Sequence, residues 1–173
     1  MCDQKEQALW RREDGFVIST DKRHLDTEMI WRFLAEESYW ASGIPRELVA
    51  TAIEHSILCY GIYEGDPSTT AAKQVGFARV VSDFTRFSWL ADVFVLPKYR
   101  GSGLSKWMLS LIVAHPKVKG TSFMLATNDA HGLYAQYGFA PLDKIENRMA
   151  RSLDWEKVYE GHGISTRADK SSK

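Results

Sequence analysis

The sequence has few cysteines, no long apolar run and no excess of one charge. Its two cysteines, Cys2 and Cys59, have no neighbours at metal-ligand spacing, so we expect neither a disulfide framework nor a structural metal. The apolar run at 108–114 is too short to cross a bilayer. Lysine plus arginine equals aspartate plus glutamate, at 22 each, so no global field favours nucleic acid or an acidic membrane. Any charged ligand must therefore be recognised by a local site.

The length and composition are those of one compact globular domain. The chain has 173 residues, of which 45% are apolar and 25% are charged. We predict one domain over 15–155, an N-terminal extension at 1–14, and a polar tail at 156–173 that has too few apolar residues to become ordered. The first fourteen residues are too charged to form a signal-peptide core. We therefore expect a cytoplasmic protein that binds neither a membrane nor nucleic acid.

The order of the expected elements indicates a mixed α+β fold. Periodicity and turn residues predict a strand at 15–20, helices at 26–38 and after Pro45, strands at 58–63, 74–82 and 89–96, a helix at 104–115, a strand at 122–127, a short helix at 130–137, and a last strand from Phe139 toward Met149. The crossover through the helix at 104–115 makes its two flanking strands parallel neighbours. The other strands should pair antiparallel in a central sheet that is flanked by helices.

The most informative segment is the turn between the strand at 89–96 and the helix at 104–115. Gly101 and Gly103 lack the Cβ atoms that would keep a ligand off the backbone, so successive amide N–H groups can converge on an anion. The helix adds its positive N-terminal pole at the same point. This pattern predicts a phosphate-binding turn, and the alternative is an ordinary connection from strand to helix.

Two nucleotide-binding motifs match this turn poorly. A Walker-type loop needs Gly-Lys-Ser/Thr, and the chain offers only Gly103-Leu104-Ser105-Lys106, which excludes that motif. A dinucleotide fingerprint needs a third glycine where Lys106 stands, although Asp129 lies beyond the next strand, as a ribose-binding acid would. Dinucleotide binding is therefore kept as the weaker alternative.

Two motifs in the second half of the chain resemble those of a known family. The first reads Val95-x-Pro97-x-Tyr99-Arg100-Gly101-Ser102-Gly103-Leu104-Ser105, and the second comprises Asn128 and Leu133-Tyr134-x-x-Tyr137-Gly138-Phe139. Together, over roughly 75–142, they resemble the acyl-CoA-binding motifs of the GNAT superfamily of N-acetyltransferases. Family members carry Gly or Ala where Ser105 stands, and we expect altered packing there rather than lost binding.

The resemblance implies that acetyl-CoA is the cosubstrate and that no metal takes part. It further implies a mostly antiparallel sheet with one splayed parallel pair of strands. The backbone of Phe94 and Val95 would pair with the pantetheine arm at the splay, and Asn128 would contact the same arm. The pyrophosphate would be held by the amides of Arg100, Gly101, Ser102, Gly103, Leu104 and Ser105. Tyr134 matches the family's tyrosine near the thioester sulfur.

Acetyl transfer to an amine first requires a neutral nucleophile. Deprotonating a lysine-like amine, with a pKa of about 10.4, costs roughly 4 to 5 kcal/mol at pH 7, so a base or a water path to one is expected. Asp92 is the nearest carboxylate in the motif strand, and its alternative role is to accept hydrogen bonds from a neighbouring loop. Glu36, Glu37 and His131 are further candidates, although the two glutamates could equally form the solvated end of a helix.

The same reaction needs a polarised carbonyl and a stabilised leaving group. A backbone N–H of Val95 is the expected partner of the carbonyl oxygen. A tyrosine has an ordinary pKa of about 10 and a thiol about 8.5, so full proton transfer from Tyr134 would cost roughly 2 kcal/mol. We therefore expect Tyr134 to donate a hydrogen bond to the developing thiolate, with packing in the core as its alternative role.

Large aromatic side chains flank the acceptor side that the resemblance implies. Tyr39 and Trp40 precede Ala41-Ser42-Gly43, and together with Glu36 they are expected to contact the acceptor. Aromatic rings would favour an amine with an apolar or aromatic body, or a cation held against a ring face. The alternative is that these rings belong to the core.

These observations predict an N-acetyltransferase that acts on a primary amine of a small molecule. The acetyl group would pass directly from acetyl-CoA within a ternary complex, since no cysteine lies in either motif. A non-catalytic acyl-CoA sensor is the alternative from another class, and dinucleotide binding is the less favoured one. The sequence leaves a homodimer open.

Overall fold

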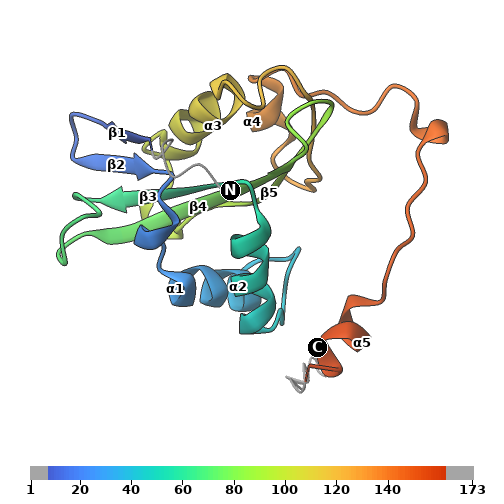
Figure 1. The fold of residues 1–173 in the computed structure, drawn as a ribbon, viewed down its shortest axis with the longest axis horizontal. Coiled ribbons are helices and arrows are strands. Elements are labelled where there is room, and N and C mark those ends of the chain that lie inside the picture. The colour runs from blue at the N-terminus through green and yellow to red at the C-terminus, as the bar shows by residue number, and fades with distance from the viewer. Residues whose placement is uncertain (1–7, 163–173) are drawn as a thin grey trace. The chain divides into compact units, whose positions relative to one another are not determined.

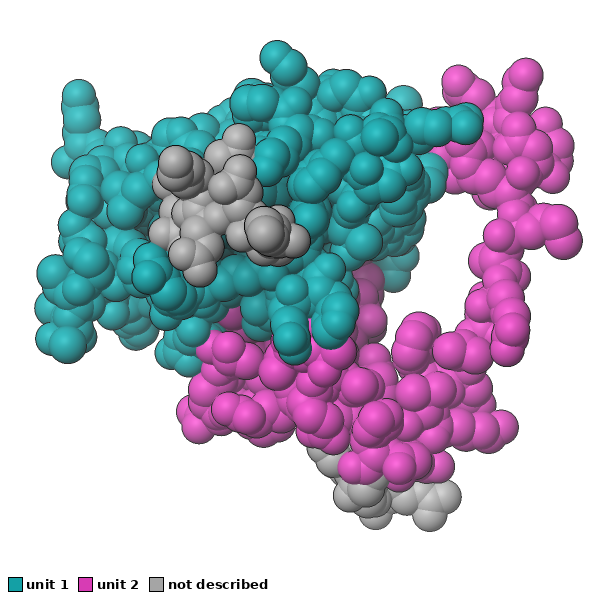
Figure 2. Space-filling model, viewed as in Figure 1, with its two compact units in different colours: residues 1–26, 52–140 teal, residues 27–51, 141–173 magenta. Residues whose placement is uncertain are grey.

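The computed structural model describes residues 8–162. The chain divides into two compact units, the first from 1–26 and 52–140 and the second from 27–51 and 141–173 (Figure 2). The first unit holds β1 (Leu9–Arg11), β2 (Phe16–Ser19), η1 (Lys22–His24), β3 (Leu58–Glu64), β4 (Lys73–Ser82), β5 (Phe87–Val95), η3 (Pro97–Tyr99), α3 (Leu104–Ala114), β6 (Ser122–Met124) and α4 (His131–Ala135). The second holds α1 (Thr27–Arg32), η2 (Phe33–Glu37), η4 (Ile145–Asn147) and α5 (Trp155–Glu160). Helix α2 (Arg46–His55) crosses the boundary at residue 52.

The six strands form one sheet in chain order, β1 to β6 (Figure 1). Neighbouring strands pair antiparallel as far as β5, and β5 pairs with β6 in parallel. The α+β class is therefore confirmed, with one parallel pair in a mostly antiparallel sheet. The crossover from β5 through α3 to β6 is also the predicted one.

Helix α3 covers one face of this sheet (Figure 1). Leu104, Met108, Leu111 and Ile112 recur at helical spacing, which predicts a core-facing stripe. Leu111 is half-buried, and Leu104, Met108 and Ile112 are at most 2% exposed. They pack in a cluster with residues from β2 to β5, namely Ile18, Tyr60, Ile62, Val75, Ala78, Val80, Leu90 and Val95. Burying one such side chain contributes about 1.5 to 3 kcal/mol, so this cluster fixes the start of α3 against the end of β5.

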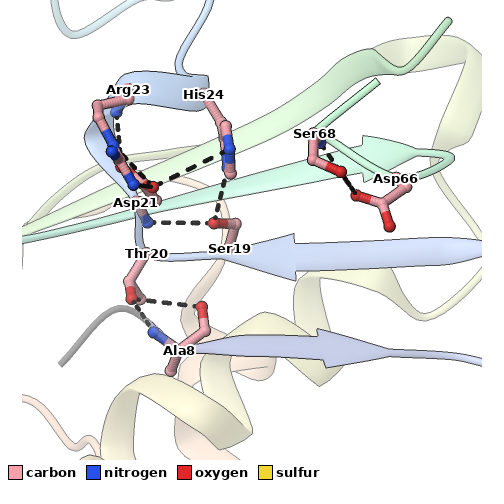
Figure 3. Close-up of polar contacts among 8 residues, drawn as sticks. All are labelled: Ala8, Ser19, Thr20, Asp21, Arg23, His24, Asp66 and Ser68. Atoms are coloured by element: carbon pink, nitrogen blue, oxygen red, sulfur yellow. Dashed lines mark hydrogen bonds and ion pairs between the residues drawn. The ribbon is translucent and has the colours of Figure 1, made fainter. Parts of the chain in front are cut away.

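The sheet begins inside the segment that the sequence suggested was an extension. The N–H of Ala8 donates to Thr20 Oγ1 at 2.9 Å, and the N–H of Thr20 donates to the Ala8 carbonyl at 3.0 Å (Figure 3). Asp21, just beyond β2, accepts from the N–H of Arg23 at 3.0 Å and caps η1. Strand β1 has only three residues and two of them are charged or aromatic, so it lacked the apolar alternation that marks a strand.

The polar and turn-forming residues at 65–70 predict an exposed loop between β3 and β4, and the structure confirms it. Gly65 has a φ of 88°. The Asp66 carboxylate accepts from the Ser68 N–H at 3.0 Å and from the Ser68 hydroxyl at 2.7 Å, as Figure 3 shows. These contacts lower the pKa of Asp66 to about 2. The loop therefore closes on its own side chains.

The predicted last strand from Phe139 to Met149 is wrong. Pro141 has no N–H to donate to a ladder, and the chain turns through η4, where the Arg148 N–H donates to the Ile145 carbonyl at 3.1 Å. Ile145 is 72% exposed and Met149 is fully exposed, so the apolar residues do not alternate between two faces. The polar tail predicted at 156–173 lies partly outside the described residues, and its described part continues α5.

Candidate active site

The parallel strands β5 and β6 separate after a short pairing. Their register runs only from Phe87 opposite Ser122 to Trp89 opposite Met124. In the described part of the chain, no register pairs 90–95 with β6. The edge of β5 that faces away from β4 is therefore left for another partner, which is the splay that the family resemblance implied.

An irregularity in β5 lies at this splay. The register between β4 and β5 shifts between Phe77 and Arg79, and Asp92 has a φ of 53°. A bulge bends its strand and increases the local twist. A non-glycine residue in this region is uncommon, although aspartate tolerates it better than most. The bulge thus falls on the predicted catalytic carboxylate.

The backbone at Val95 faces the open edge of β5. The N–H of Leu96 donates to the Val75 carbonyl of β4 at 2.8 Å. In a trans peptide the C=O and N–H point in opposite directions, so the Val95 carbonyl points away from β4. Within a strand, the N–H and C=O of one residue point toward the same neighbour, so the Val95 N–H faces the open edge as well.

The turn at 100–105, called the cradle below, has a backbone geometry that suits an anion. Gly101 and Gly103 have φ values of 84° and 76°. No atom lies within 4 Å of a Cβ built on Gly101, so dihedral angle rather than lack of space requires glycine there. The first helical bond of α3 runs from the Trp107 N–H to the Gly103 carbonyl at 2.9 Å. The amides at the start of α3 therefore have no carbonyl of a preceding helical turn to bond. The N–H of Arg100, which was expected to bind the pyrophosphate, instead donates to the Pro97 carbonyl at 3.2 Å.

Two polar side chains brace this turn. Arg100 Nε donates to the Val95 carbonyl at 3.0 Å. The Ser102 hydroxyl donates to the Tyr99 carbonyl at 2.7 Å. Arg100, Ser102 and both glycines are exposed, whereas Leu104 is buried and Ser105 is half-buried. Solvent, and hence a ligand, can reach the amides of the turn.

The second sequence motif lies beside α3 in the same unit. The Tyr137 hydroxyl, just after α4, donates to the carbonyl of Lys106 in α3 at 2.7 Å. Tyr134 on α4 is 8% exposed and packs edge-on against Phe139, with ring centroids 5.9 Å apart. Asn128 is exposed in the turn between β6 and α4. The fold thus brings together two motifs that are about thirty residues apart.

Asp92 forms an ion pair with an arginine that the sequence analysis did not single out. Arg79 Nε lies 2.5 Å from Asp92 Oδ2, and both side chains are largely buried, at 20% and 14% exposed. The Arg79 guanidinium also donates to the Ser56 hydroxyl at 3.3 Å. A lone arginine within Val75-Gly76-Phe77-Ala78-Arg79-Val80-Val81 was the signal for this partner, because a buried charge in an apolar strand requires one.

The buried cysteine near this pair is a poor nucleophile. Cys59 is 1% exposed, and burial raises the pKa of its thiol to about 11. A thiol of that pKa carries very little thiolate at neutral pH. Direct transfer without an acyl-cysteine intermediate fits this environment.

The predicted acceptor residues belong to the second unit. Tyr39 and Trp40 are 51% and 42% exposed, and their rings meet edge-on with centroids 5.0 Å apart. They follow η2, a π-helical turn closed by a bond from the Ser38 N–H to the Phe33 carbonyl at 3.0 Å. Glu36 in that turn is exposed. Single π-helical turns occur frequently at functional sites.

Two features are absent from residues 8–162. Within that range no three His, Cys, Asp or Glu side chains are grouped so that they could hold a metal ion. Over the same range, no helix combines the length and the apolar character needed to cross a membrane.

Comparison with known proteins identifies relatives of this chain. Residues 58–141 match the family model described as the acetyltransferase (GNAT) domain. A solved structure from Xanthomonas campestris pv. campestris, described as belonging to the GNAT family, is 46% identical with a TM-score of 0.73. That match covers 80% of this chain and 93% of the other.

Two curated relatives are also similar. A Gibberella zeae protein, whose name gives its acetyltransferase assignment provisionally, is 32% identical over 60% of this chain and 64% of its own length. Serotonin N-acetyltransferase 2, chloroplastic, of Oryza sativa subsp. japonica is 31% identical over 73% of this chain and 62% of its own. The chain therefore spans less than two thirds of each curated relative.

Proposed function

The chain belongs to the GNAT family of acetyltransferases, and on that premise we propose that it transfers an acetyl group from acetyl-CoA to a primary amine of a small molecule. One observation carries the proposal. The glycine turn before α3, with Gly101 and Gly103 both at positive φ, follows directly on the unpaired edge of β5. This combination suits a ligand with an anionic end and a long arm that has amide groups, which is the chemistry of an acyl-CoA.

Binding of acetyl-CoA would use backbone groups for the most part. The amides at 101–105 would bond the pyrophosphate, helped by the positive pole of α3. The pantetheine arm would lie along the open edge of β5, where Phe94 and Val95 end the strand, and Asn128 would contact it from the other motif. The Val95 N–H would then polarise the thioester carbonyl.

Transfer would proceed by direct attack in a ternary complex. The neutral amine nitrogen forms a bond to the acetyl carbon, the C–S bond breaks, and the proton that the nitrogen then loses passes to the departing CoA sulfur, so that the products are the amide and the CoA thiol. Asp92 would take the proton from the incoming ammonium, directly or through water, while Arg79 holds its carboxylate. Tyr134 would donate a hydrogen bond to the thiolate as it forms.

The acceptor is proposed to carry an apolar or aromatic body. Tyr39 and Trp40 present exposed ring faces in the second unit, and exposed aromatic pairs of this kind commonly contact ligands. The relative from Oryza sativa named as a serotonin N-acetyltransferase supports the same class. Glu36, which lies in η2, would attract the ammonium group of the amine.

A non-catalytic acyl-CoA sensor is the second candidate. It is favoured by one observation, namely that the carboxylate proposed as the base is already paired with Arg79 at 2.5 Å. If that pair only anchors the bulge of β5, the protein would bind acyl-CoA without transferring the acetyl group.

Thiol release from acetyl-CoA separates the two candidates. The full chain is incubated with acetyl-CoA and a panel of arylalkylamines, polyamines and amino sugars, and free CoA thiol is measured against a reaction without amine. We expect release above that control with at least one arylalkylamine. Binding of acetyl-CoA without amine-dependent release across the panel would contradict transfer and support the sensor.

A further inference from the structure

The N-terminal hairpin places an arginine against the cradle. Arg12 lies in the turn between β1 and β2, where its N–H donates to the Phe16 carbonyl at 2.9 Å and its carbonyl accepts from the Gly15 N–H at 3.1 Å. These two bonds fix the Arg12 backbone. Its side chain is 26% exposed, so most of it is in contact with protein.

The guanidinium of Arg12 contacts the cradle turn directly, although the two are 90 residues apart in the chain. Its Nη2 donates to the Ser102 carbonyl at 3.1 Å. Its Nη1 lies 3.9 Å from the place that a Cβ on Gly103 would occupy. The guanidinium carbon also lies 5.4 Å from the ring centroid of Trp107, in the first turn of α3. Arg12 therefore bonds the turn at Ser102 and lies close to both Gly103 and the first turn of α3.

Other groups hold the guanidinium in this position. Arg12 Nε donates to Asp14 Oδ1 at 2.9 Å, and Nη2 forms an ion pair with Asp14 Oδ2. The ring of Phe16 lies 5.6 Å from the guanidinium carbon. A planar guanidinium with several fixed partners is better suited than an ammonium to orient one carbonyl.

The contact with Ser102 sets the direction of an amide in the cradle. The Ser102 carbonyl and the Gly103 N–H belong to one trans peptide, so they point in opposite directions. Because Arg12 holds the carbonyl on the hairpin side, the Gly103 N–H must face the other side of the turn. The Ser102 hydroxyl, bonded to the Tyr99 carbonyl, fixes the same residue from its side chain.

We propose that Arg12 is a positioning residue for the acyl-CoA pyrophosphate, which it serves by holding the Ser102–Gly103 peptide with its N–H directed at the phosphate. The inference rests on the proposed function, since it assumes that the cradle receives an acyl-CoA. Arg12 acts through the backbone and also adds a positive charge next to the site. Its effect should therefore be confined to ligands that carry the pyrophosphate.

Calorimetric titration with CoA and with pantetheine tests this restriction. Pantetheine has the same thiol arm but lacks the pyrophosphate. Loss of a hydrogen bond from a charged donor should weaken CoA binding about tenfold in Arg12→Gln. Pantetheine affinity should stay unchanged, and Arg12→Lys should recover part of the loss.

The neighbouring arginine provides the matched control. Arg11 pairs with Asp66 at 2.6 Å, and its side chain is 56% exposed. Arg11→Gln removes the same charge from the same hairpin, so unchanged CoA affinity in that variant would exclude a general effect of net charge. Thermal unfolding of each variant shows whether the hairpin is intact.

Three results would overturn the inference. Equal weakening of CoA and pantetheine would mean that Arg12 only supports the fold. Unchanged CoA affinity in Arg12→Gln would mean that the Ser102 carbonyl needs no partner. If the unsubstituted protein does not bind CoA, the proposed function fails and the inference fails with it, whereas the first two results leave the proposed function intact.

Discussion

The cradle at 100–105 and the aromatic segment at 36–40 are both proposed to bind a substrate, but they present different groups to it. The cradle offers backbone amides, and Gly101 and Gly103 determine where these point. The aromatic segment offers the exposed side chains of Tyr39 and Trp40. A backbone site depends on dihedral angles and tolerates many side chains, whereas a side-chain site changes with each substitution. The proposed cofactor site would therefore be tied to the fold, whereas the proposed acceptor site would be free to vary.

The largest effect is expected at a residue that belongs to neither binding region. Tyr134→Phe removes the proposed hydrogen-bond donor to the thiolate, so kcat should fall by roughly 10²- to 10³-fold, the range for loss of one donor to a developing negative charge. The affinity for acetyl-CoA should not change, because the cradle is intact. Steady-state kinetics and a CoA titration together measure this split.

Tyr137→Phe is the matched control for that variant. Its hydroxyl donates to the Lys106 carbonyl of α3 at 2.7 Å, so its contact is with that helix rather than with the thioester. Its kcat should stay within about threefold of the original, since a neutral hydrogen bond contributes only about 1 kcal/mol to stability. Equal losses in both variants would remove Tyr134 from the chemistry.

A substitution in the cradle should weaken the binding of acetyl-CoA and leave the acceptor site unchanged. Gly103 has a φ of 76°, which a β-branched residue adopts only at a cost of about 1 to 3 kcal/mol. Gly103→Val should therefore reorient the turn and weaken acetyl-CoA binding about 30-fold, as measured by calorimetry. Gly120→Val, at an exposed glycine without positive φ, is the control and should bind normally. Normal binding by Gly103→Val would show that the cradle does not depend on its dihedral angles.

The ion pair between Arg79 of β4 and Asp92 of β5 should affect the stability of the fold. Arg79→Met leaves the Asp92 carboxylate, 14% exposed, without its arginine, so the free energy of unfolding should fall by about 2 kcal/mol. Adding Asp92→Asn removes the carboxylate charge that the arginine had neutralised and should restore about half of the loss. Urea unfolding of the two single variants and the double variant measures this coupling. Strict additivity would show that the pair contributes nothing of its own.

The smallest effect is expected in the aromatic segment at 36–40. Tyr39→Ala should raise the KM for an aromatic amine about three- to fivefold, because one exposed aromatic contact contributes roughly 0.5 to 1.5 kcal/mol. The KM for acetyl-CoA should not move. Arg32→Gln, an exposed position in α1 paired with Glu28, is the control. A change in the acetyl-CoA KM in Tyr39→Ala would break the division between the two regions.

The sequence predicted the local features of the cradle and of α3 better than the contacts between distant side chains. Local rules predict a turn at Gly101 and Gly103, and the structure has it between η3 and α3. They also predict the buried stripe of α3, which holds Leu104, Met108 and Ile112. The contacts of Arg79 with Asp92, and of Arg12 with Ser102, join residues 13 and 90 positions apart. No local pattern specifies such pairs, because they depend on strand register and on where the hairpin packs.

Two errors in the predicted strands have the same origin. Strand β1 is too short and polar to show alternation, and it is held in the sheet by bonds between Ala8 and Thr20. The segment from Phe139 to Met149 has enough apolar residues for a strand but contains Pro141 and bends through η4. In both cases hydrogen-bond partners, rather than composition, decide whether the segment joins the sheet.

The most direct test of the central claim is a calorimetric titration of the full chain with CoA and, separately, with NAD. Both ligands carry a pyrophosphate, but only CoA has the pantetheine arm that the open edge of β5 is proposed to bind. The account predicts saturable binding of CoA, weakened in Gly103→Val, and no saturable binding of NAD. Saturable binding of NAD without binding of CoA would contradict it and would assign the turn to a dinucleotide.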